Sequence, residues 1–387
     1  MTIAQLLTEF VETYGKNKWT YSTYTAMVAR IQHYVIPMIG DINVEDFDVR
    51  SAERFYKDLL DQPSRSYKNR NCSRSVVREI HKLLNEAFNR AVIWEIIPSN
   101  KIVNAVYPLE EKNERVIWNE ETIRYAIENC EDPLMSLAIN MAFSLTLRRS
   151  ELLALTWDDV YLNESPAYVK VNKIIQRVEL FAIDDLAGRD IYKVFESTKQ
   201  DSASVLVLKK PKTASSVRKV FIPDTLTETL IKFKQAQNEL IRNTPGYEDN
   251  NLIFAGPTGY PTEPRKLTSD FRKTVNHMGL PKVCFHSLRH SSITYKLKIS
   301  NGDIKAVQGD SGHAKASMIT ELYSHINEKD RINNTMLLDK MFFKNENNDI
   351  IERNLDNTAS IDNPAQIAEL IEKNNRLIEE LFAKLGK

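Results

Sequence analysis

The first hundred residues carry two apolar patterns with a 3-4 spacing, which an α-helix gathers onto a single face. A polar, turn-rich stretch from Pro63 to Ser73 and the helix-breaking pair Ile39–Gly40 separate the two patterns. The faces comprise Ile3, Leu6, Leu7, Phe10, Val11 and Tyr14, and then Ile80, Leu83, Leu84, Ala87, Phe88, Ala91 and Val92. This region therefore predicts a small α-helical domain, residues 1–105.

Helix and strand patterns follow one another in the next part of the chain. A charged, apolar-poor stretch predicts a linker, residues 106–117, after which Asn119 is placed to cap a helix with acidic residues in its first turn. Period-two alternation predicts a strand from Tyr168 to Ile175, and a strand hairpin from Val205–Leu208 and Val217–Ile222. Further helices are expected from Leu134 to Phe143 and from Leu226 to about Phe343.

Two segments stand apart from this pattern. Residues 176–204 are long and polar with few strand signals, and we expect a mobile or inserted segment there. In the tail, residues 344–387, Asn363 can cap a helix whose apolar positions fall on a heptad-like seam. The expected fold class is α+β and mainly α: a helical N-terminal domain, a second domain of residues 118–343 with a small antiparallel sheet, and a C-terminal helical tail.

The overall charge neither supports nor excludes a polyanionic partner. The 52 basic and 52 acidic residues cancel, but the tail from Asn345 holds nine acidic and five basic ones, which leaves 47 basic and 43 acidic residues elsewhere. No apolar run approaches the ~20 residues of a membrane span. Cys72, Cys130 and Cys284 are too far apart for a CxxC site and odd in number. We expect a cytoplasmic protein without membrane association.

Basic residues gather just before the second helical pattern. One interpretation is an ordinary solvated face, and the other is a surface that contacts nucleic-acid phosphates. The residues are Lys68, Arg70, Arg74 and Arg78. The sequence leaves both interpretations open.

Four segments of the second domain carry side chains suited to chemistry at a phosphate. Arg148 lies among apolar residues in TLRRSELLAL, and a buried guanidinium needs an anion, either a structural carboxylate or a bound phosphate. Lys212 lies at the tip of the expected hairpin. A lysine there is usually solvated, but a loop can also deliver its ammonium into a site built elsewhere.

The other two segments lie further along the chain. His286 and Arg289 are three residues apart at an expected helix start, where free backbone N–H groups attract anions, although an ordinary capped helix has the same pattern. His313 follows a glycine, and Tyr323 is either a half-buried core residue or a nucleophile. Five of the seven histidines fall between residues 277 and 325, but no HExxH or cysteine partner accompanies them, so we expect no metal site.

These six groups together suit attack on a phosphodiester without a metal ion. A free phenol has a pKa of about 10 and needs a base or a positive environment to act as a nucleophile. Two arginines can bind the non-bridging oxygens and offset the charge of the transition state. A lysine can protonate the leaving oxygen, and histidines can hydrogen-bond the phosphate or carry protons.

In this order the six residues resemble the active site of the tyrosine recombinases, the phage integrase family. The boxes LRRSELLAL, PKTASS, FHSLRHSSIT, SGH and LYSH are similar to that family's motifs, over roughly Trp118 to Ile326. The N-terminal helices resemble its core-site DNA-binding domain more weakly. The resemblance implies that the second domain, residues 118–343, is the catalytic domain.

The resemblance also implies a role for each residue. Tyr323 would attack the scissile phosphate and form a 3′-phosphotyrosyl link, with Lys212 as general acid. Arg148 and Arg289 would hold the phosphate, assisted by His286 and His313. Strand exchange would pass through a Holliday junction in a homotetramer on double-stranded DNA with core sites, without a cofactor. Integration or excision of a mobile element, a DNA-bending accessory protein, a directionality factor and a nucleoid-associated location are expectations of the same kind.

The chain departs from the family pattern in several places. Thr146 stands where glycine is usual and Ser311 where leucine is usual, and we interpret both as packing variants. Residues 176–204 exceed the family's usual short hairpin and are candidates for contact with DNA or a partner. We expect the small arm-site-binding domain to be absent, and the tail helix to pack either on its own subunit or on a neighbour.

Two other functions remain open at this stage. A type IB topoisomerase would use similar tyrosine chemistry without exchange, and it would relax any supercoiled plasmid as a monomer. A non-catalytic DNA-binding regulator on the same scaffold would keep its full biological effect after Tyr323→Phe.

Overall fold

The computed structural model describes residues 1–65, 67–109, 116–196, 201–300 and 302–320. By its contacts the chain divides into two compact units, Met1–Leu322 and Tyr323–Lys387. In the second unit the described residues are 332, 335, 336, 338 and 339. Tyr323, the expected tail helix from Asn363 and residues 110–115 of the expected linker therefore lie outside the described residues.

Both predicted N-terminal helix patterns are confirmed. The Thr2 hydroxyl accepts a hydrogen bond from the Gln5 backbone N–H (3.3 Å), and the Gln5 side chain accepts one from the Thr2 N–H (2.9 Å), which fixes the start of the first helix. The apolar faces close a hydrophobic core of their own with Phe47 and Phe55. The helical segments are α1 (Ile3–Phe10), η1 (Val11–Gly15), α2 (Lys16–Lys18), α3 (Tyr21–Arg30), η2 (Ile31–Val35), α4 (Ile36–Ile39), α5 (Val49–Leu59) and α6 (Arg74–Ile93).

The helices expected after the linker are present as far as residue 320, and the rest of the expected helical region, to about Phe343, lies largely outside the described residues. The Asn119 side chain accepts from the Thr122 N–H (2.9 Å), as predicted for the cap of the helix that follows. The helical segments are α7 (Glu120–Asn129), α8 (Pro133–Ser144), α9 (Arg149–Leu152), η3 (Trp157–Asp159), α10 (Leu180–Asp185), η4 (Ala214–Ser216), α11 (Asp224–Asn243), α12 (Pro264–His277), α13 (Ser287–Ile299), α14 (Ile304–Ser311) and α15 (Ser317–Thr320).

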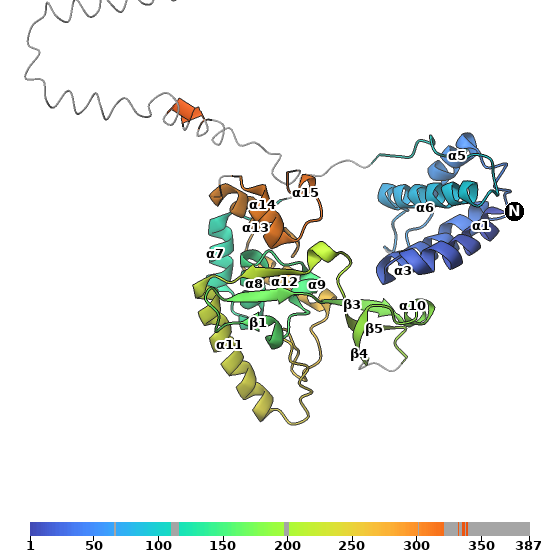
Figure 1. Cartoon of the computed structure of the whole chain (residues 1–387). Helices are drawn as coiled ribbons and strands as arrows, with labels where there is room; N and C mark the ends of the chain where they lie inside the picture. The colour runs from blue at the N-terminus through green and yellow to red at the C-terminus, as the bar shows by residue number, and fades with distance from the viewer. Residues whose placement is uncertain are drawn as a thin grey trace, which may run out of the picture. The chain divides into compact units, whose positions relative to one another are not determined.

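Within the described residues, two small antiparallel sheets take the place of the single one expected. Their strand orders are β1–β2–β6 and β3–β5–β4, and β6 lies against α14 (Figure 1). The strands are β1 (Val160–Tyr161), β2 (Tyr168–Val171), β3 (Ile174–Glu179), β4 (Ile191–Phe195), β5 (Ser204–Lys209) and β6 (Arg218–Phe221).

The hairpin predicted from the strands at 205–208 and 217–222 is wrong, because each of these strands pairs with an earlier one. β5 pairs with β3 and β6 pairs with β2. The two strand pairs are connected differently on their two sides. β2 leads into β3 through residues 172 and 173, whereas residues 210–217 separate β5 from β6. Lys212 therefore lies on the loop of residues 210–217, which connects strands of two different sheets, and not at the tip of a hairpin.

The segment of residues 176–204 is an insertion, one of the two alternatives expected, but it carries more strand than its sequence indicated. Outside residues 197–200 it is regular structure, with α10 and β4 inserted between β3 and β5. Its apolar side packs against α3, where Tyr24 Oη donates to Asp185 Oδ2 (2.8 Å). The Arg189 guanidinium donates to the carbonyls of Asn17 (3.0 Å) and Trp19 (2.7 Å). These long-range contacts order a segment whose own sequence is polar.

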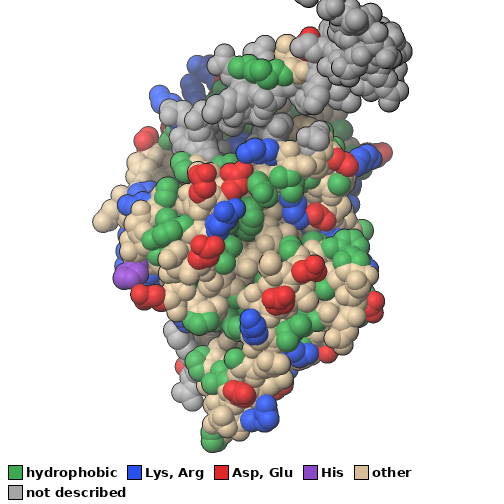
Figure 2. All heavy atoms as spheres, turned by 90° about the vertical axis from the view of Figure 1, so that its left-hand side faces the viewer, with side chains coloured by type: hydrophobic (Ala, Val, Ile, Leu, Met, Phe, Trp, Pro, Cys, Tyr) green, Lys and Arg blue, Asp and Glu red, His purple; other side chains and the backbone are tan. Residues whose placement is uncertain are grey.

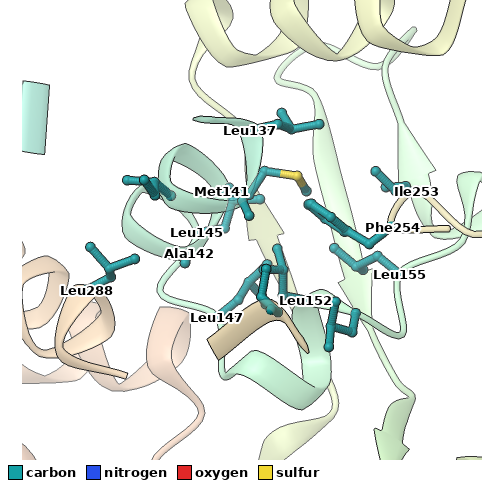
Figure 3. Packing of buried hydrophobic residues seen from close by; sticks show 14 of the residues in the cluster. Leu137, Met141, Ala142, Leu145, Leu147, Leu152, Leu155, Ile253, Phe254 and Leu288 are labelled. Carbon is teal, nitrogen blue, oxygen red and sulfur yellow. The ribbon is translucent and has the colours of Figure 1, made fainter. Parts of the chain in front are cut away.

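A second hydrophobic core, centred on α8, supports the segments that carry the arginines of interest. Leu147 and Leu152, on either side of Arg148, pack with Met141 and Leu145 of the α8 region (Figure 3). Leu288, next to Arg289, belongs to the same core. Two distant parts of the sequence are therefore anchored on one rigid base.

The surface on the side of α7 and α11 carries no concentration of one charge. Figure 2 shows acidic and basic side chains intermixed there with apolar ones. Among the described residues, no helix is both long and apolar enough to span a membrane.

Candidate active site

Arg289 is a fully buried arginine of the site. It follows the start of α13, and the residue is 1% exposed. Its Nη1 donates to the Thr146 carbonyl and its Nη2 to the Ser311 carbonyl. Its Nε has no hydrogen-bond partner among the described residues. A buried guanidinium held by carbonyls, with one donor still open, is suited to receive an anion.

Arg148 lies at the N-cap of α9 and is held by Glu151. The Glu151 carboxylate accepts from the Arg148 backbone N–H (2.9 Å) and from Arg148 Nη1 (2.7 Å). Arg148 Nη2 lies 3.4 Å from the Gly312 carbonyl oxygen. The Arg148 side chain keeps 30% exposure, so its guanidinium has a neutralising carboxylate on one side and access to a ligand on the other.

A third arginine shares the same carboxylate. Arg218 at the start of β6 donates through Nη2 and Nη1 to the two Glu151 oxygens (3.0 and 3.2 Å). Burial alone would raise the pKa of Glu151, but the charges of Arg218 and then Arg148 lower it. Arg148 and Arg218 pair with Glu151, and Arg289 adds a third positive charge nearby, so these described residues carry a surplus of two positive charges.

His313 joins the cluster in a defined tautomer. Its Nε2 lies 3.3 Å from Arg289 Nη2, and a guanidinium only donates, so Nε2 carries the lone pair. The proton is therefore on Nδ1, which donates to the Ser311 hydroxyl (2.9 Å). Burial, followed by the charges of Arg289 and Arg148, lowers the pKa of His313 to about 4. The imidazole is neutral at physiological pH and presents an acceptor toward Arg289.

Folding stability is expected to fall as the pH drops from about 6.5 to about 4, in part through His313. In this window the unfolded chain binds a proton at His313 that the folded chain does not, so acid favours unfolding. His313→Gln is expected to flatten the dependence on pH. Urea unfolding of both proteins at several pH values measures this, and parallel curves would exclude the buried neutral imidazole.

The burial of Arg289 has a related consequence. Burial, and then the charge of Arg148, lowers the pKa of Arg289 to about 9, which leaves it protonated at neutral pH. An arriving anion would favour the charged form of Arg289 and of His313. A bound phosphate would therefore offset the unfavourable electrostatics of these two buried groups.

Lys212 and His286 lie on segments next to those of Arg289 and His313. Lys212 is exposed on the loop of residues 210–217. That loop approaches the His313 segment, since a Cβ built on Gly312 would lie 2.8 Å from the Ser215 carbonyl oxygen. His286 caps α13, is exposed, and packs edge-to-face on His290 (4.8 Å between ring centroids). The sequence predicted that His286 and Arg289 project to one side of the helix, but His286 is exposed whereas Arg289 is buried.

The structure thus brings Arg148, Arg289 and His313 together. Tyr323 lies beyond α15 and outside the described residues. The basic residues near α6 are separate from this cluster: Lys68, Arg70 and Arg74 are exposed, and Arg74 Nη1 donates to the Leu109 carbonyl (3.2 Å). Arg78 lies 3.5 Å from a Glu79 carboxylate oxygen. In the described part of the chain no cluster of His, Cys, Asp and Glu is arranged to hold a metal ion.

The backbone conformation of Thr146 accounts for the glycine that is usual at this position. Its φ is +55°, in the left-handed region, at the end of α8. Leu147 N donates to the Ala142 carbonyl (3.2 Å) and Thr146 N to that of Phe143 (3.3 Å), the pattern of a Schellman cap. A β-branched residue is disfavoured there. A hydrogen bond between the Thr146 and Ser292 hydroxyls (2.8 Å) offsets this cost and keeps the Thr146 carbonyl facing Arg289.

Three contributors to the site were not identified from the sequence. Glu151 had a usable signal, because a carboxylate three residues after an arginine at a helix start can pair with it. Arg218 had none, since its partner is distant in sequence. Ser311 is more than a packing variant, because its carbonyl accepts from Arg289 and its hydroxyl from His313.

The chain is similar to known sequences. The model of the phage integrase family matches residues 218–330. A tyrosine recombinase XerC-like protein of Caldanaerobacter subterraneus is 27% identical over 301 residues, covering 75% of this chain and 70% of the relative. The ICEBs1 integrase of Bacillus subtilis is 24% identical over 257 residues, covering 66% and 62%.

Solved structures share the fold. The Tn1549 transposon integrase in complex with transposon right end DNA has a TM-score of 0.66 at 18% identity, over 87% of this chain and 99% of that one. A lambda integrase dimer bound to a core site has a TM-score of 0.57 at 17% identity, over 83% and 95%. The family model and the sequence relatives support the tyrosine recombinase, or phage integrase, family for this chain, and the solved structures share its fold. It is accordingly an enzyme of the DNA strand-transferase type.

Proposed function

We propose that this chain carries out site-specific recombination by cutting and rejoining DNA through Tyr323, with a 3′-phosphotyrosyl intermediate. The observation that supports this most is the Arg289 guanidinium, buried and with an open Nε beside Arg148 and His313. Such a cluster with surplus positive charge matches a phosphodiester whose charge grows in the transition state. The integrase relatives favour integration or excision of a mobile element as the biological task.

Each residue has a proposed part in the reaction. Arg148 and Arg289 bind the non-bridging oxygens, and the bound phosphate makes His313 more basic, so that Nε2 can take a proton and then donate it in a hydrogen bond to the phosphate. Tyr323 forms the bond to phosphorus while the bond to the 5′ oxygen breaks. Lys212, on its exposed loop, gives that oxygen a proton, and His286 assists from the start of α13. A second 5′-hydroxyl reverses the linkage, so bond energy is conserved.

The proposal includes the partners. Double-stranded DNA with core sites is the substrate, and a homotetramer passes it through a Holliday junction. A lambda integrase tetramer bound to a Holliday junction is among the solved structures that share the fold, with a TM-score of 0.56. In the N-terminal region, exposed Lys68, Arg70 and Arg74, with Arg78, supply phosphate contacts. Accessory DNA-bending and directionality factors and a cytoplasmic, nucleoid-associated location complete the proposal.

Covalent capture tests this function. The purified full-length protein is mixed with a random library of nicked duplexes and denatured, and the DNA that stays attached is sequenced. Wild type is expected to retain DNA enriched for an inverted repeat, whereas Tyr323→Phe retains none. DNA binding without an adduct in wild type would contradict the proposal and favour a non-catalytic regulator. Adducts without sequence preference, with relaxation of any plasmid, would favour a topoisomerase.

A further inference from the structure

Arg218 is a buried arginine at a junction of the segments that carry the candidate catalytic groups. It lies at the start of β6, directly after the loop of residues 210–217 that carries Lys212. Its side chain is 6% exposed. A buried guanidinium so placed either has a structural role alone or controls the groups around it.

The hydrogen bonds of Arg218 reach three segments. Its two terminal nitrogens donate to the Glu151 carboxylate (3.0 and 3.2 Å) in the segment of Arg148. Nη1 also donates to the Ser216 carbonyl (3.0 Å) in the Lys212 loop. Nε donates to the Asp310 carbonyl (2.6 Å) near the end of α14, three residues before His313. One rigid, planar group thereby fixes three segments relative to one another.

Gly312 shows how closely the His313 segment approaches Arg218. A Cβ on Gly312 would lie 3.0 Å from Arg218 Cδ and 3.1 Å from Nη1, and the φ of Gly312 is +63°. A side chain is therefore excluded both by contact with Arg218 and by the backbone conformation. The segment that leads to His313 rests directly on Arg218.

The positive charge of Arg218 also affects how strongly Glu151 acts on Arg148. Glu151 is 1% exposed, and its carboxylate accepts from both Arg148 and Arg218. Without Arg218, the full negative charge of Glu151 would act on Arg148 alone and compete with a phosphate for it. With Arg218 in place, the carboxylate is shared, and Arg148 keeps attraction for a second anion.

We propose that Arg218 is a positioning residue for strand transfer, which holds the Lys212 loop and the His313 segment in register and prevents Glu151 from neutralising Arg148. The inference rests on the proposed function. It assigns Arg218 no contact with the reacting phosphate. Its effect is therefore expected on the cleavage step more than on DNA binding.

The test measures single-turnover cleavage of a nicked duplex and DNA affinity for the same full-length variants. Arg218→Met is expected to slow adduct formation by about tenfold or more while DNA affinity changes little. Arg177→Met is the matched control, because Arg177 also forms an arginine–carboxylate pair, with Glu263, on β3. The control is expected to cleave at the wild-type rate.

Two further variants separate the two effects that we assign to Arg218, on the position of the segments and on the charge around Arg148. In Arg218→Met/Glu151→Gln the orphaned carboxylate is also neutralised, so cleavage is expected to recover part of the loss, while the part that comes from the released Lys212 loop and His313 segment remains. A double variant that cleaves no faster than Arg218→Met would overturn the charge effect. Arg218→Lys keeps the charge but loses the fork, so an unchanged cleavage rate in that variant would overturn the positioning effect, and this variant also serves if Arg218→Met does not fold. A wild type that forms no adduct contradicts the proposed function instead.

Discussion

Replacing Arg289 with lysine is expected to reduce the rate of DNA cleavage by about 10²–10³-fold. The guanidinium donates to the Thr146 and Ser311 carbonyls and contacts His313, and its Nε has no hydrogen-bond partner among the described residues. A lysine ammonium has no planar fork and cannot serve these directions at once. Single-turnover adduct formation on a nicked duplex measures the effect.

Arg177→Lys is the control for this change, because Arg177 is an arginine on β3 whose side chain donates to the Glu263 carboxylate and to the Ser204 carbonyl. It is expected to cleave normally. Arg289→Lys that cleaves at the wild-type rate, with a melting temperature like that of wild type, would mean that Arg289 is a structural residue. The phosphate site would then have to lie elsewhere.

Glu151→Ala is expected to lower the free energy of unfolding by about 3–5 kcal/mol. It leaves Arg218, 6% exposed, without its carboxylate, beside the charges of Arg148 and Arg289. Glu151→Gln keeps the shape and some hydrogen bonding, so its loss is expected to be smaller. Urea unfolding at neutral pH compares the two variants with wild type.

Addition of Arg218→Met to Glu151→Gln is expected to restore part of the stability, because it removes one of the charges that the carboxylate had compensated. A Glu151→Ala variant as stable as wild type would contradict this account of the cluster. It would mean that water reaches the guanidinium groups and screens them.

Features that depend on neighbours in sequence could be predicted. The face of α1, the long α6 and the cap at Asn119 each follow from residues three or four apart. The order of the candidate residues was also visible, and three of them, Arg148, Arg289 and His313, do converge. Local spacing and motif order were therefore sufficient for the helices and for the centre of the site.

Features that depend on distant partners could not be predicted. The strand at residues 205–208 looked like half of a hairpin, but it pairs with β3 across the inserted α10 and β4. The inserted segment is polar, and its order comes from contacts such as Tyr24 with Asp185, more than a hundred residues apart. The pattern of one segment does not show which distant segment it will contact in the fold.

The same limit applies within the site. The sequence indicated that Arg148 needs an anion and left open whether this is a carboxylate or a phosphate. The structure supplies the carboxylate of Glu151 and then divides it between Arg148 and Arg218. Only the fold shows that the carboxylate is shared, and that Arg148 is paired with Glu151 while its side chain keeps 30% exposure.

Identification of the attachment residue tests the central claim most directly. Full-length protein is trapped on a nicked duplex that carries a captured site, the adduct is digested with protease, and the DNA-linked peptide is sequenced by mass spectrometry. A 3′-phosphate linked to the peptide that contains Tyr323, with a free 5′-hydroxyl on the released strand, is the predicted result. Attachment to another residue, or DNA released intact on denaturation, would contradict the assignment of Tyr323 as the nucleophile.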